Sequence, residues 1–446
     1  DRRGVGGVAV SDGLQVVRTG PDGVFELVTS VAREFVHLSV PRGHEIPTSA
    51  TGTGTFYRRI QPDASGDMRA SFTLRALEWD DARHAALIMA DVQTQNAFEM
   101  DRYHSETVPD VRDTIAALGQ HEVIGISAGD IMFDDLSLYP RYEEAVARMG
   151  VPFFQAVGNH DLDFDGGTDE ATTRTFSEHF GPRYYSFDRG DVHYVVLDDV
   201  MYHGSGYIGY LDHDQLTWLE NDLALVESGR PVLVVTHIPV VGTRHLREGE
   251  RSPSESGSIN NREVLYRLLE RFDAHVVAGH THENDHRYGN GIHEHVSGTV
   301  CGAWWSGDIC GDGTPNGYSI YEVDGSEITW RYKATGLGAD HQLRAYGRGA
   351  DPASPGEIVA NVWDADEDWV VTWYEGGDRR GSMTRRTGED PRSVREHTGP
   401  ELPERRSWVD PYPTAHLYHA PVPSGHGVIT VEAIDRFGRV YSAKLP

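Results

Sequence analysis

Five short apolar runs in the middle of the chain are each followed at once by polar side chains of the kinds that bind metal ions. The motifs are Asp91-Val92-Gln93, Gly129-Asp130, Gly158-Asn159-His160-Asp161, His237-Ile238-Pro239 and Gly279-His280-Thr281-His282. Because buried strands of an α/β domain end at one edge of the sheet, we expect these groups to meet in space. Glycine directly precedes Asp130 and His280, where a side chain would obstruct the turn or the metal.

The types of these side chains indicate which metals they would hold. They are carboxylates, amides and imidazoles without a thiolate, which suits borderline to hard divalent ions such as Mn, Fe or Zn. Such a set is too large for one tetrahedral zinc and fits two ions about 3.5–4 Å apart that share one carboxylate.

The elements that position these motifs alternate between apolar runs and helical stretches from about residue 85 onward. Runs of four to six residues suit strands that are buried on both faces, so we predict a layered α/β domain. The predicted strands span 85–90, 123–127, 153–157, 194–197, 232–235 and 274–278. The predicted helices span 108–118, 142–148, 216–227 and 261–272.

The two flanking segments have a different pattern, in which short strands are separated by turn residues. Residues 1–84 show no helical periodicity and predict a small β-sandwich, with strands that include 24–27 and a last strand at 71–77. Strands return in 337–446, which predicts a second β-sandwich. The Pro-, Arg- and Glu-rich stretch 387–412 is expected to be a long loop.

Length and charge restrict the classes of function. A chain of 446 residues is too long for one core of usual size, so two or three domains are expected. The net charge of −29 repels polyanions, which argues against extended nucleic-acid binding and against a nuclease. The longest apolar run, 85–90, falls far short of the roughly 20 residues that span a membrane. The oligomeric state is left open.

The order of the motifs resembles the calcineurin-like metallophosphoesterases. The series reads D-x-Q, GD, GNHD, H-x-P and GHTH, and Gln93 stands where the wider family usually has histidine. The D-x-Q form is similar to a subgroup with small β domains on both sides of the core, whose extended signatures resemble 181–187, 191–194 and 313–318. The resemblance implies an α/β core with four layers, α/β/β/α, over 85–336, flanked by accessory β-sandwiches at 1–84 and 337–446.

The resemblance also implies a role for each site residue. Asp130 would bridge the two ions, and His160 would stay off the metals and protonate the leaving group, oriented by Asp161. The first ion would take Asp91, Gln93, Asp130 and His282, and the second would take Asp130, Asn159, His237 and His280. Two cations would activate water and neutralise the phosphate oxygens.

The implied function is hydrolysis of phosphate esters by a dinuclear metal enzyme. No arginine-rich motif for a terminal phosphate dianion is visible, so we favour a phosphodiesterase that acts on an extracellular or cell-envelope phosphate, in a glycan, a polymer or a small diester. A phosphomonoesterase is one alternative. A catalytically inactive binding or adhesion module with a metal site is the other.

Six further residues are candidates for the substrate pocket. Tyr202, His203, Arg244 and His245 follow strands that should point at the site. Trp304 and Trp305 follow the last metal motif and would stack on a sugar or base, with packing in the core as the alternative.

The two cysteines bear on the compartment. Cys301 and Cys310 are nine positions apart in a glycine-rich loop, which predicts a local disulfide in an oxidising environment, with two buried free thiols as the alternative. The sequence contains no signal peptide, and its opening fits a mature exported protein, so an extracellular or cell-envelope location is expected. Lys333 and Lys444 are the only lysines, and this arginine bias suggests a GC-rich, bacterial genome.

Overall fold

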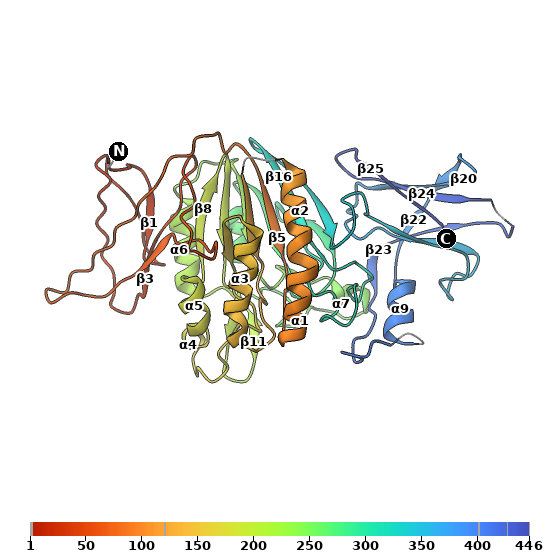
Figure 1. Cartoon of the computed structure of the whole chain (residues 1–446), viewed down its shortest axis with the longest axis horizontal. Coiled ribbons are helices and arrows are strands. Elements are labelled where there is room, and N and C mark those ends of the chain that lie inside the picture. The colour runs from red at the N-terminus through yellow and green to blue at the C-terminus, as the bar shows by residue number, and fades with distance from the viewer. Residues whose placement is uncertain (1–2, 120–121, 400–401, 426, 446) are drawn as a thin grey trace.

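The computed structural model describes residues 3–119, 122–399, 402–425 and 427–445. Three regions follow one another along its long axis, with a small N-terminal sheet at one end, the two-sheet core in the middle and a β domain at the other end (Figure 1). Among the described residues, no helix combines the length and the apolar character that crossing a bilayer requires.

The core contains two sheets that pack face to face. The six-stranded sheet has the order β14 (Asp285–Gly289), β15 (Ile292–Val296), β13 (Asp273–Ala278), β12 (Pro231–Val235), β9 (Val192–Val196) and β8 (Tyr185–Arg189). The five-stranded sheet has the order β17 (Glu327–Ala334), β16 (Gly317–Asp324), β5 (Arg83–Met89), β6 (Val123–Ser127) and β7 (Phe153–Gln155). All six predicted core strands are present in these sheets.

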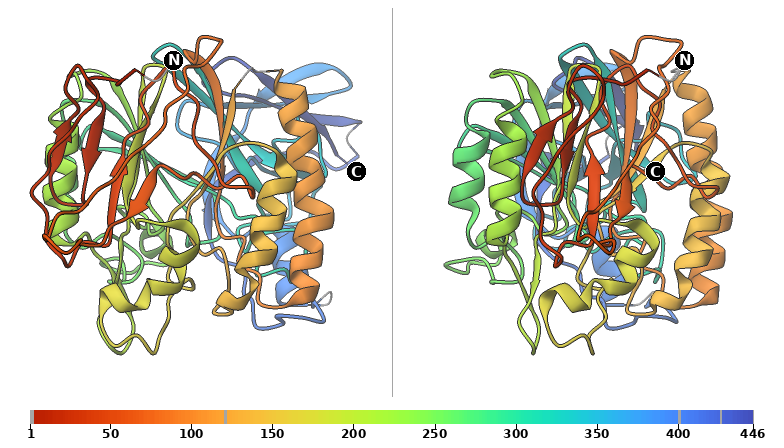
Figure 2. Two further views of the ribbon diagram at one scale, coloured as in Figure 1. Left: turned by 60° about the vertical axis from the view of Figure 1, so that its left-hand side comes forward. Right: turned by 90° about the vertical axis from the view of Figure 1, so that its left-hand side faces the viewer.

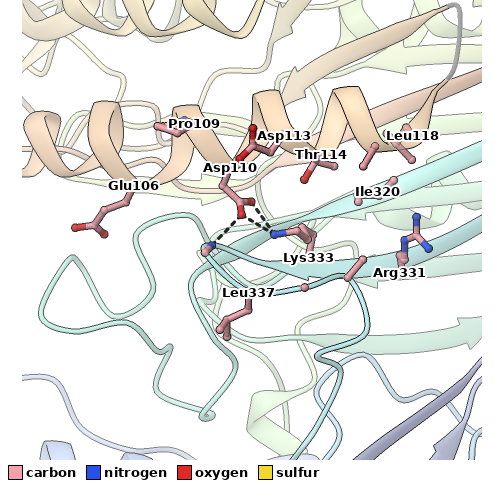
Figure 3. Close-up of a pocket in the computed structure, with 14 residues that line it drawn as sticks. Glu106, Pro109, Asp110, Asp113, Thr114, Leu118, Ile320, Arg331, Lys333 and Leu337 are labelled. Carbon is pink, nitrogen blue, oxygen red and sulfur yellow. Dashed lines mark hydrogen bonds and ion pairs between the residues drawn. The ribbon is translucent and has the colours of Figure 1, made fainter.

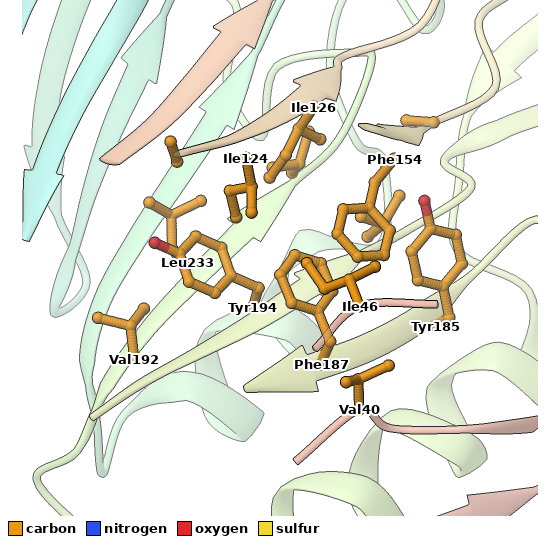
Figure 4. Packing of buried hydrophobic residues seen from close by; sticks show 14 of the residues in the cluster. Val40, Ile46, Ile124, Ile126, Phe154, Tyr185, Phe187, Val192, Tyr194 and Leu233 are labelled. Atoms are coloured by element: carbon orange, nitrogen blue, oxygen red, sulfur yellow. The ribbon is translucent and has the colours of Figure 1, made fainter. Parts of the chain in front are cut away.

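The side chains of each central strand alternate between two apolar layers, because successive residues of a strand point to opposite faces. On β5, Ala86 and Ile88 face the other sheet, whereas Leu87 packs against helices. Figure 4 shows part of the layer between the sheets, where Phe154 of one sheet and Phe187 of the other stack at 3.9 Å between ring centroids.

Helices cover the outer face of each sheet, which confirms the predicted α/β/β/α layers (Figure 2). The five-stranded sheet is covered by α2 (Val108–Leu118) and α3 (Tyr139–Met149), and the six-stranded sheet by α6 (His213–Leu223) and α8 (Arg262–Leu269). The glycines Gly119 and Gly150 end α2 and α3 in the left-handed conformation that favours glycine. The shorter helices are α1 (Ala97–Arg102), α4 (Asp169–Thr172), α5 (Arg174–Phe180) and α7 (Arg244–Arg247). A π-helical turn spans Tyr103–Thr107, and a 3-10 turn spans Leu136–Leu138. The strands β10 (Val200–Tyr202) and β11 (Tyr207–Gly209) form a separate hairpin.

The N-terminal region forms one small sheet in its described part, so the prediction of a β-sandwich there is wrong. The sheet has the order β2 (Val16–Arg18), β1 (Ala9–Ser11), β3 (Phe35–Leu38) and β4 (Tyr57–Arg59). Its apolar face does not need a second sheet, because Val10, Val36 and Leu38 pack into the layer between the core sheets. The segments 24–27 and 71–77 lie against this cluster as extended chain without regular strands.

The C-terminal region does form a sandwich of two four-stranded sheets around a common apolar core, as predicted. One sheet contains β18 (Arg344–Tyr346), β19 (Glu357–Asn361), β23 (Thr414–Pro421) and β22 (Thr384–Gly388), and the other β21 (Asp378–Ser382), β20 (Val370–Glu375), β24 (Ile429–Ile434) and β25 (Val440–Lys444). The predicted loop 387–412 contains the helix α9 (Pro391–His397). Its described residues 402–412 form an extended segment, the C-terminal arm, that reaches the core.

The predicted disulfide is wrong, because Cys301 and Cys310 are both free and buried. Both thiols lie near the Thr299 hydroxyl, at 3.7 Å for the Cys301 sulfur and 3.6 Å for the Cys310 sulfur. The Cys301 sulfur also lies 3.6 Å from Nδ1 of His282.

Candidate metal centre

Four of the predicted ligands form a tight group around His237. Its Nε2 lies 3.3 Å from Oδ1 of Asp130 and 3.1 Å from Oδ1 of Asn159. The same nitrogen lies 3.2 Å from Nδ1 of His280. These are the residues that the second ion was predicted to take, and the structure brings all of them together.

The remaining three ligands lie around Asp91 and Asp130. Nε2 of His282 is 3.5 Å from Oδ1 of Asp91, and the backbone N–H of His280 donates to Oδ2 of Asp91 at 2.9 Å. The Gln93 amide donates to Oδ2 of Asp130 at 2.9 Å. Asp130 therefore contacts both halves of the cluster, as the predicted bridging carboxylate should.

Five of these seven ligands adopt the left-handed backbone conformation that residues other than glycine rarely take. Each such residue costs on the order of 1–2 kcal/mol. The strain lets the chain turn sharply at the end of a strand and direct the next side chain into the cluster. The φ angles are 48° at Asp91, 46° at Gln93, 48° at Asp130, 70° at His280 and 54° at His282.

Three glycines make room for the cluster. A Cβ atom on Gly129 would lie 2.7 Å from Nδ1 of His237, and one on Gly279 would overlap the Asp91 carboxylate. A Cβ atom on Gly158 would overlap Asp130. The predicted need for glycine before Asp130 and before His280 is confirmed.

Hydrogen bonds to backbone carbonyls turn two imidazoles toward the cluster. Nδ1 of His237 donates to the carbonyl of Ala128 at 2.9 Å, and Nδ1 of His282 donates to the carbonyl of Gly302 at 2.6 Å. A neutral ring that donates from Nδ1 keeps its Nε2 lone pair free, which is the arrangement of metal-binding histidines. Asp199 was not predicted, but it accepts the backbone N–H of His237 at 3.0 Å and fixes this turn.

The charges of the cluster fit divalent cations. Burial would raise the pKa of Asp130, but His237 and His160 together lower it below its ordinary value. The pKa of His237 is raised to about 10, because the attraction of Asp130 outweighs burial. Oδ1 of Asp91 is buried with no hydrogen-bond partner in the described chain. This oxygen and Nε2 of His237, which would give up its proton when a cation binds, mark positions where a cation would satisfy the site.

His160 lies beside the ligands, and its orienting partner is not the predicted one. Its backbone N–H donates to Oδ1 of Asp130 at 2.8 Å, and its ring is edge-on to Phe133 at 4.4 Å. Nδ1 of His160 lies 2.7 Å from Oδ1 of Asp134. The imidazole is therefore oriented by Asp134, which is 26 positions away in the sequence and gave no motif.

The carboxylate of Asp161 serves a different purpose from the one predicted. It accepts the backbone N–H groups of Ile131 at 3.0 Å, Met132 at 3.1 Å and Gly158 at 3.0 Å. The hydroxyl of Tyr139 donates to it as well, at 3.0 Å. Burial and the nearby Asp130 raise the pKa of Asp161 to about 7. Asp161 thus ties together the two turns that carry Asp130 and Asn159.

Two of the predicted substrate residues lie at a small cavity beside the cluster. The cavity has a volume of about 200 Å³, and Arg244, His245, His280 and Thr281 are among the residues that line it. The Arg244 guanidinium lies 3.8 Å from the ring centroid of Tyr412 and donates to the carbonyl of Thr281. Arg244 and His245 therefore border the same cavity as the predicted ligand His280.

Two other candidates, Tyr202 and His203, lie in the β10–β11 hairpin, and neither is among the residues that line the cavity beside His280. The Tyr202 hydroxyl donates to the carbonyls of Gly204 at 3.1 Å and Phe164 at 3.3 Å, and His203 is exposed in the turn. The hairpin brings another residue to the centre instead. The ring of Tyr207 stands edge-on to His280, at 6.0 Å between centroids.

The two tryptophans have different environments. Trp304 is half-buried and stacks on His282 at 4.2 Å between centroids. Trp305 is only 2% exposed, and its indole N–H donates to the carbonyl of Val92 at 2.9 Å. Trp305 is therefore a packing residue, which is the alternative that the sequence left open for it.

The C-terminal region contacts the metal centre through its arm. The Tyr412 hydroxyl donates to the carbonyl of His282, and the ring of Trp408 lies 4.9 Å from that of Trp304. Arg406 donates to Oε1 of Gln95 at 2.9 Å. The sequence offered no sign of these contacts, because their partners lie more than a hundred positions apart.

A larger cavity lies elsewhere, between α2 and the strands β16 and β17 (Figure 3). Its volume is about 530 Å³. Lys333 donates to both carboxylate oxygens of Asp110 at 2.7 and 2.8 Å, so the central charges of this cavity neutralise each other. The predicted ligands do not line it.

Family models match three consecutive parts of the chain. The model described as the N terminal of calcineurin-like phosphoesterase matches residues 1–77, and the calcineurin-like phosphoesterase model matches 86–284. The model described as the C terminal of calcineurin-like phosphoesterase matches 294–441. Together these matches cover the N-terminal sheet, the metal centre and the C-terminal sandwich.

A curated relative and two solved structures are similar to parts of the chain. The serine/threonine-protein phosphatase CPPED1 of Danio rerio is 30% identical over 190 residues, which are 41% of this chain and 56% of that protein, so the match spans about half of the relative. A dimetal phosphatase from Danio rerio matches 56% of this chain and 96% of its own, with 14% identity and a TM-score of 0.38. A purple acid phosphatase from yellow lupin seeds matches 62% and 57%, with 16% identity and a TM-score of 0.39.

Proposed function

The chain belongs to the calcineurin-like phosphoesterase family, and we propose that it is an enzyme that hydrolyses phosphate esters at a centre of two divalent metal ions, Mn, Fe or Zn. The observation that carries the proposal is the meeting of seven carboxylate, amide and imidazole ligands, five of them on left-handed backbone. Two cations bound there would activate water and neutralise the phosphate oxygens.

His160 would protonate the leaving oxygen. Burial would lower its pKa, but Asp130 and Asp134 outweigh burial, so the pKa is raised and the ring is held more readily in its protonated form. With Nδ1 turned toward Asp134, the other ring nitrogen is left to donate. General acid catalysis by a positioned histidine typically contributes about 10²–10⁴-fold to the rate.

We favour phosphate diesters as substrates. The cavity beside His280 contains one guanidinium, that of Arg244, which lies 3.8 Å from Glu283 and stacks on Tyr412. A diester carries a single negative charge and needs less positive charge around it than a terminal phosphate dianion. Phosphomonoester hydrolysis is the second candidate, because the zebrafish relative is named as a phosphatase.

We further propose that the substrate is an extracellular or cell-envelope phosphate in a bacterium. The accessory β regions and the strongly acidic composition support this proposal. Cys301 and Cys310 are free thiols, so no disulfide supports an oxidising compartment. Detection of the protein in culture medium or envelope fractions supports the proposal, and detection in the cytosol alone refutes it.

A substrate panel tests the proposed activity. Protein reconstituted with Mn, Fe or Zn is assayed on bis-nitrophenyl phosphate and on nitrophenyl phosphate, and the ratio of kcat/KM separates diesterase from monoesterase. A chain that binds two ions and hydrolyses neither ester, nor any glycan or polymer phosphate in the panel, is the inactive binding module.

A further inference from the structure

Four histidines lie together on one face of the six-stranded sheet. His293 and His295 are two positions apart on β15, so both point to the same side. In the strand register, His275 of β13 is opposite His293, and His286 of β14 is opposite His295. The side chains face the layer between the two sheets, where they contact Trp330 of β17.

Three of these imidazoles converge. His275, His293 and His295 each offer one ring nitrogen, and the three nitrogens all lie within 4.8 Å of one another. Nδ1 of His275 is 3.0 Å from Nε2 of His295. All three side chains are sealed from water, with exposed fractions of 8%, 7% and 2% in chain order. We call these three residues the triple-histidine cluster.

The triple-histidine cluster contains a polar atom that the described protein does not satisfy. Nδ1 of His295 is buried without a hydrogen-bond partner. A buried nitrogen without a partner is unfavourable, whether it carries a proton or a lone pair. A partner that accepts the lone pairs of several imidazoles at once would remove this cost.

The carboxylate of Asp364 orients the triple-histidine cluster through His286. Oδ1 of Asp364 lies 3.1 Å from Nε2 of His286, and Nδ1 of His286 lies 3.1 Å from Nε2 of His293. Because a carboxylate only accepts, His286 donates from Nε2 and accepts the N–H of His293 at its own Nδ1. His293 then keeps a lone pair on Nδ1. Such carboxylate–histidine chains commonly position metal ligands.

The surrounding charge also suits a cation. The guanidinium of Arg436 lies over the rings of Tyr288 and Trp330. It pairs with Asp366 at 3.3 Å and with Asp368. With Asp364 added, carboxylates outnumber this positive charge. Burial lowers the pKa of all three clustered imidazoles, so they are neutral and able to coordinate.

We propose that His275, His293 and His295 bind one borderline divalent transition metal ion, of the Zn²⁺ kind, at a structural site separate from the metal centre. An all-imidazole set suits zinc and its neighbours and does not suit Mg²⁺ or Ca²⁺. Zinc–nitrogen bonds of about 2.0–2.1 Å require nitrogens about 3.4 Å apart, so binding would need only small adjustments of the rings. His275 lies on β13, and His280 follows two residues after that strand ends, so at most about 16–18 Å of chain joins the two sites.

The structural role follows from where the four histidines and Asp364 lie. His275, His286 and the β15 pair belong to neighbouring strands of the core, whereas Asp364 belongs to the C-terminal region. An ion in the triple-histidine cluster would therefore tie β13 to β15 and, through His286 on β14, fix the C-terminal region against them.

Crystals of the full wild-type chain grown with Zn²⁺ test the site directly. Anomalous scattering at the zinc edge is expected to give a peak between His275, His293 and His295, apart from any peak at the metal centre. A filled metal centre with no peak at the triple-histidine cluster overturns the proposal.

Zinc content in solution provides a second test. His295→Gln is expected to bind one zinc ion fewer per chain than the wild type. The matched control His280→Gln alters the metal centre and should keep the zinc at the triple-histidine cluster. Equal zinc content in folded His295→Gln and wild type contradicts the proposal. If His295→Gln does not fold, the crystals decide.

Discussion

The metal centre and the triple-histidine cluster lie on the same sheet but on different kinds of backbone. His275, His293 and His295 occupy regular strand positions with paired neighbours on both sides. The ligands of the metal centre come after the strands end, and His280 and His282 have φ angles of 70° and 54°. Strained backbone is therefore found at the metal centre, whereas the triple-histidine cluster lies on regular strand backbone.

Exposure separates the two clusters further. His280 borders a cavity beside the metal centre, whereas the triple-histidine cluster is closed off by Trp330 and the neighbouring rings. Substitutions at the metal centre should therefore reduce activity more than stability. Substitutions in the triple-histidine cluster should do the reverse.

The largest effect is expected for Asp130→Asn. It removes the charge shared by the two proposed ions, and several kcal/mol of transition-state stabilisation with them, so activity should fall at least about 10³-fold. Hydrolysis of nitrophenyl esters by the metal-loaded variant measures the loss, and circular dichroism controls for folding. Near-normal activity in this variant would show that Asp130 is not essential for hydrolysis, and the metal centre would then not differ from the triple-histidine cluster in its importance for activity.

The next largest effect is expected for His160→Ala. An alkyl leaving group needs a proton, so its hydrolysis should slow by about 10²–10⁴-fold. Nitrophenolate leaves easily as an anion, so nitrophenyl esters should be affected much less. Rates on both substrate classes, measured with metal content unchanged, distinguish the two. An equal loss on both classes would mean that His160 is not the general acid.

Asp134→Asn should give a weaker version of the same pattern, about tenfold on alkyl esters, because it only loosens the His160 ring. The matched control is Asp161→Asn, which weakens the hydrogen bonds from Ile131, Met132 and Gly158 and should lower the melting temperature. If Asp161→Asn slowed alkyl esters selectively and Asp134→Asn did not, Asp161 would be the residue that orients His160, as first expected from the sequence.

A smaller effect is expected for Tyr412→Phe, which removes the hydrogen bond from the C-terminal arm to the carbonyl of His282. A loss of about 1 kcal/mol corresponds to roughly fivefold weaker metal binding at the Asp91 side of the centre. Metal titration measures it. Tyr441→Phe, in the same region but bonded to Asp435, is the control and should bind as the wild type does.

The smallest change in activity is expected for His295→Gln. Zinc-loaded protein should lose thermal stability, at about 2–4 °C per kcal/mol for a domain of this size, while turnover per folded molecule stays within about twofold of wild type. Differential scanning calorimetry and the esterase assay measure the two quantities. A large fall in turnover with an unchanged melting temperature would show that the two clusters are not functionally distinct.

Local patterns in the sequence were sufficient to predict the core strands and the edge where polar side chains meet. The four layers and the roles of the seven predicted ligands came from the resemblance to the calcineurin-like metallophosphoesterases. Alternation of apolar runs and helices marks buried strands, and the polar residue after each run marks the edge where the ligands meet. The left-handed φ angles at Asp91 and Gln93 have no such signal. They arise from the turns that the tertiary fold imposes where β5 ends.

The predictions that proved wrong concern contacts between distant segments. Asp161 follows His160 in the chain, yet Asp134, from another turn, reaches the imidazole. The N-terminal strands look like half of a sandwich, but Val36 and Leu38 are covered by the core. Tyr412 and His282 are 130 positions apart, and no local pattern connects them. Composition cannot show which of two surfaces covers an apolar face.

The central claim is that two metal ions lie among the seven ligands and share Asp130. Crystals of the wild-type chain grown with Mn²⁺ and measured at the manganese edge test it most directly. Two anomalous peaks about 3.5–4 Å apart are expected, with the Asp130 carboxylate between them. A single peak under saturating Mn²⁺, or two peaks that Asp130 does not bridge, would contradict it.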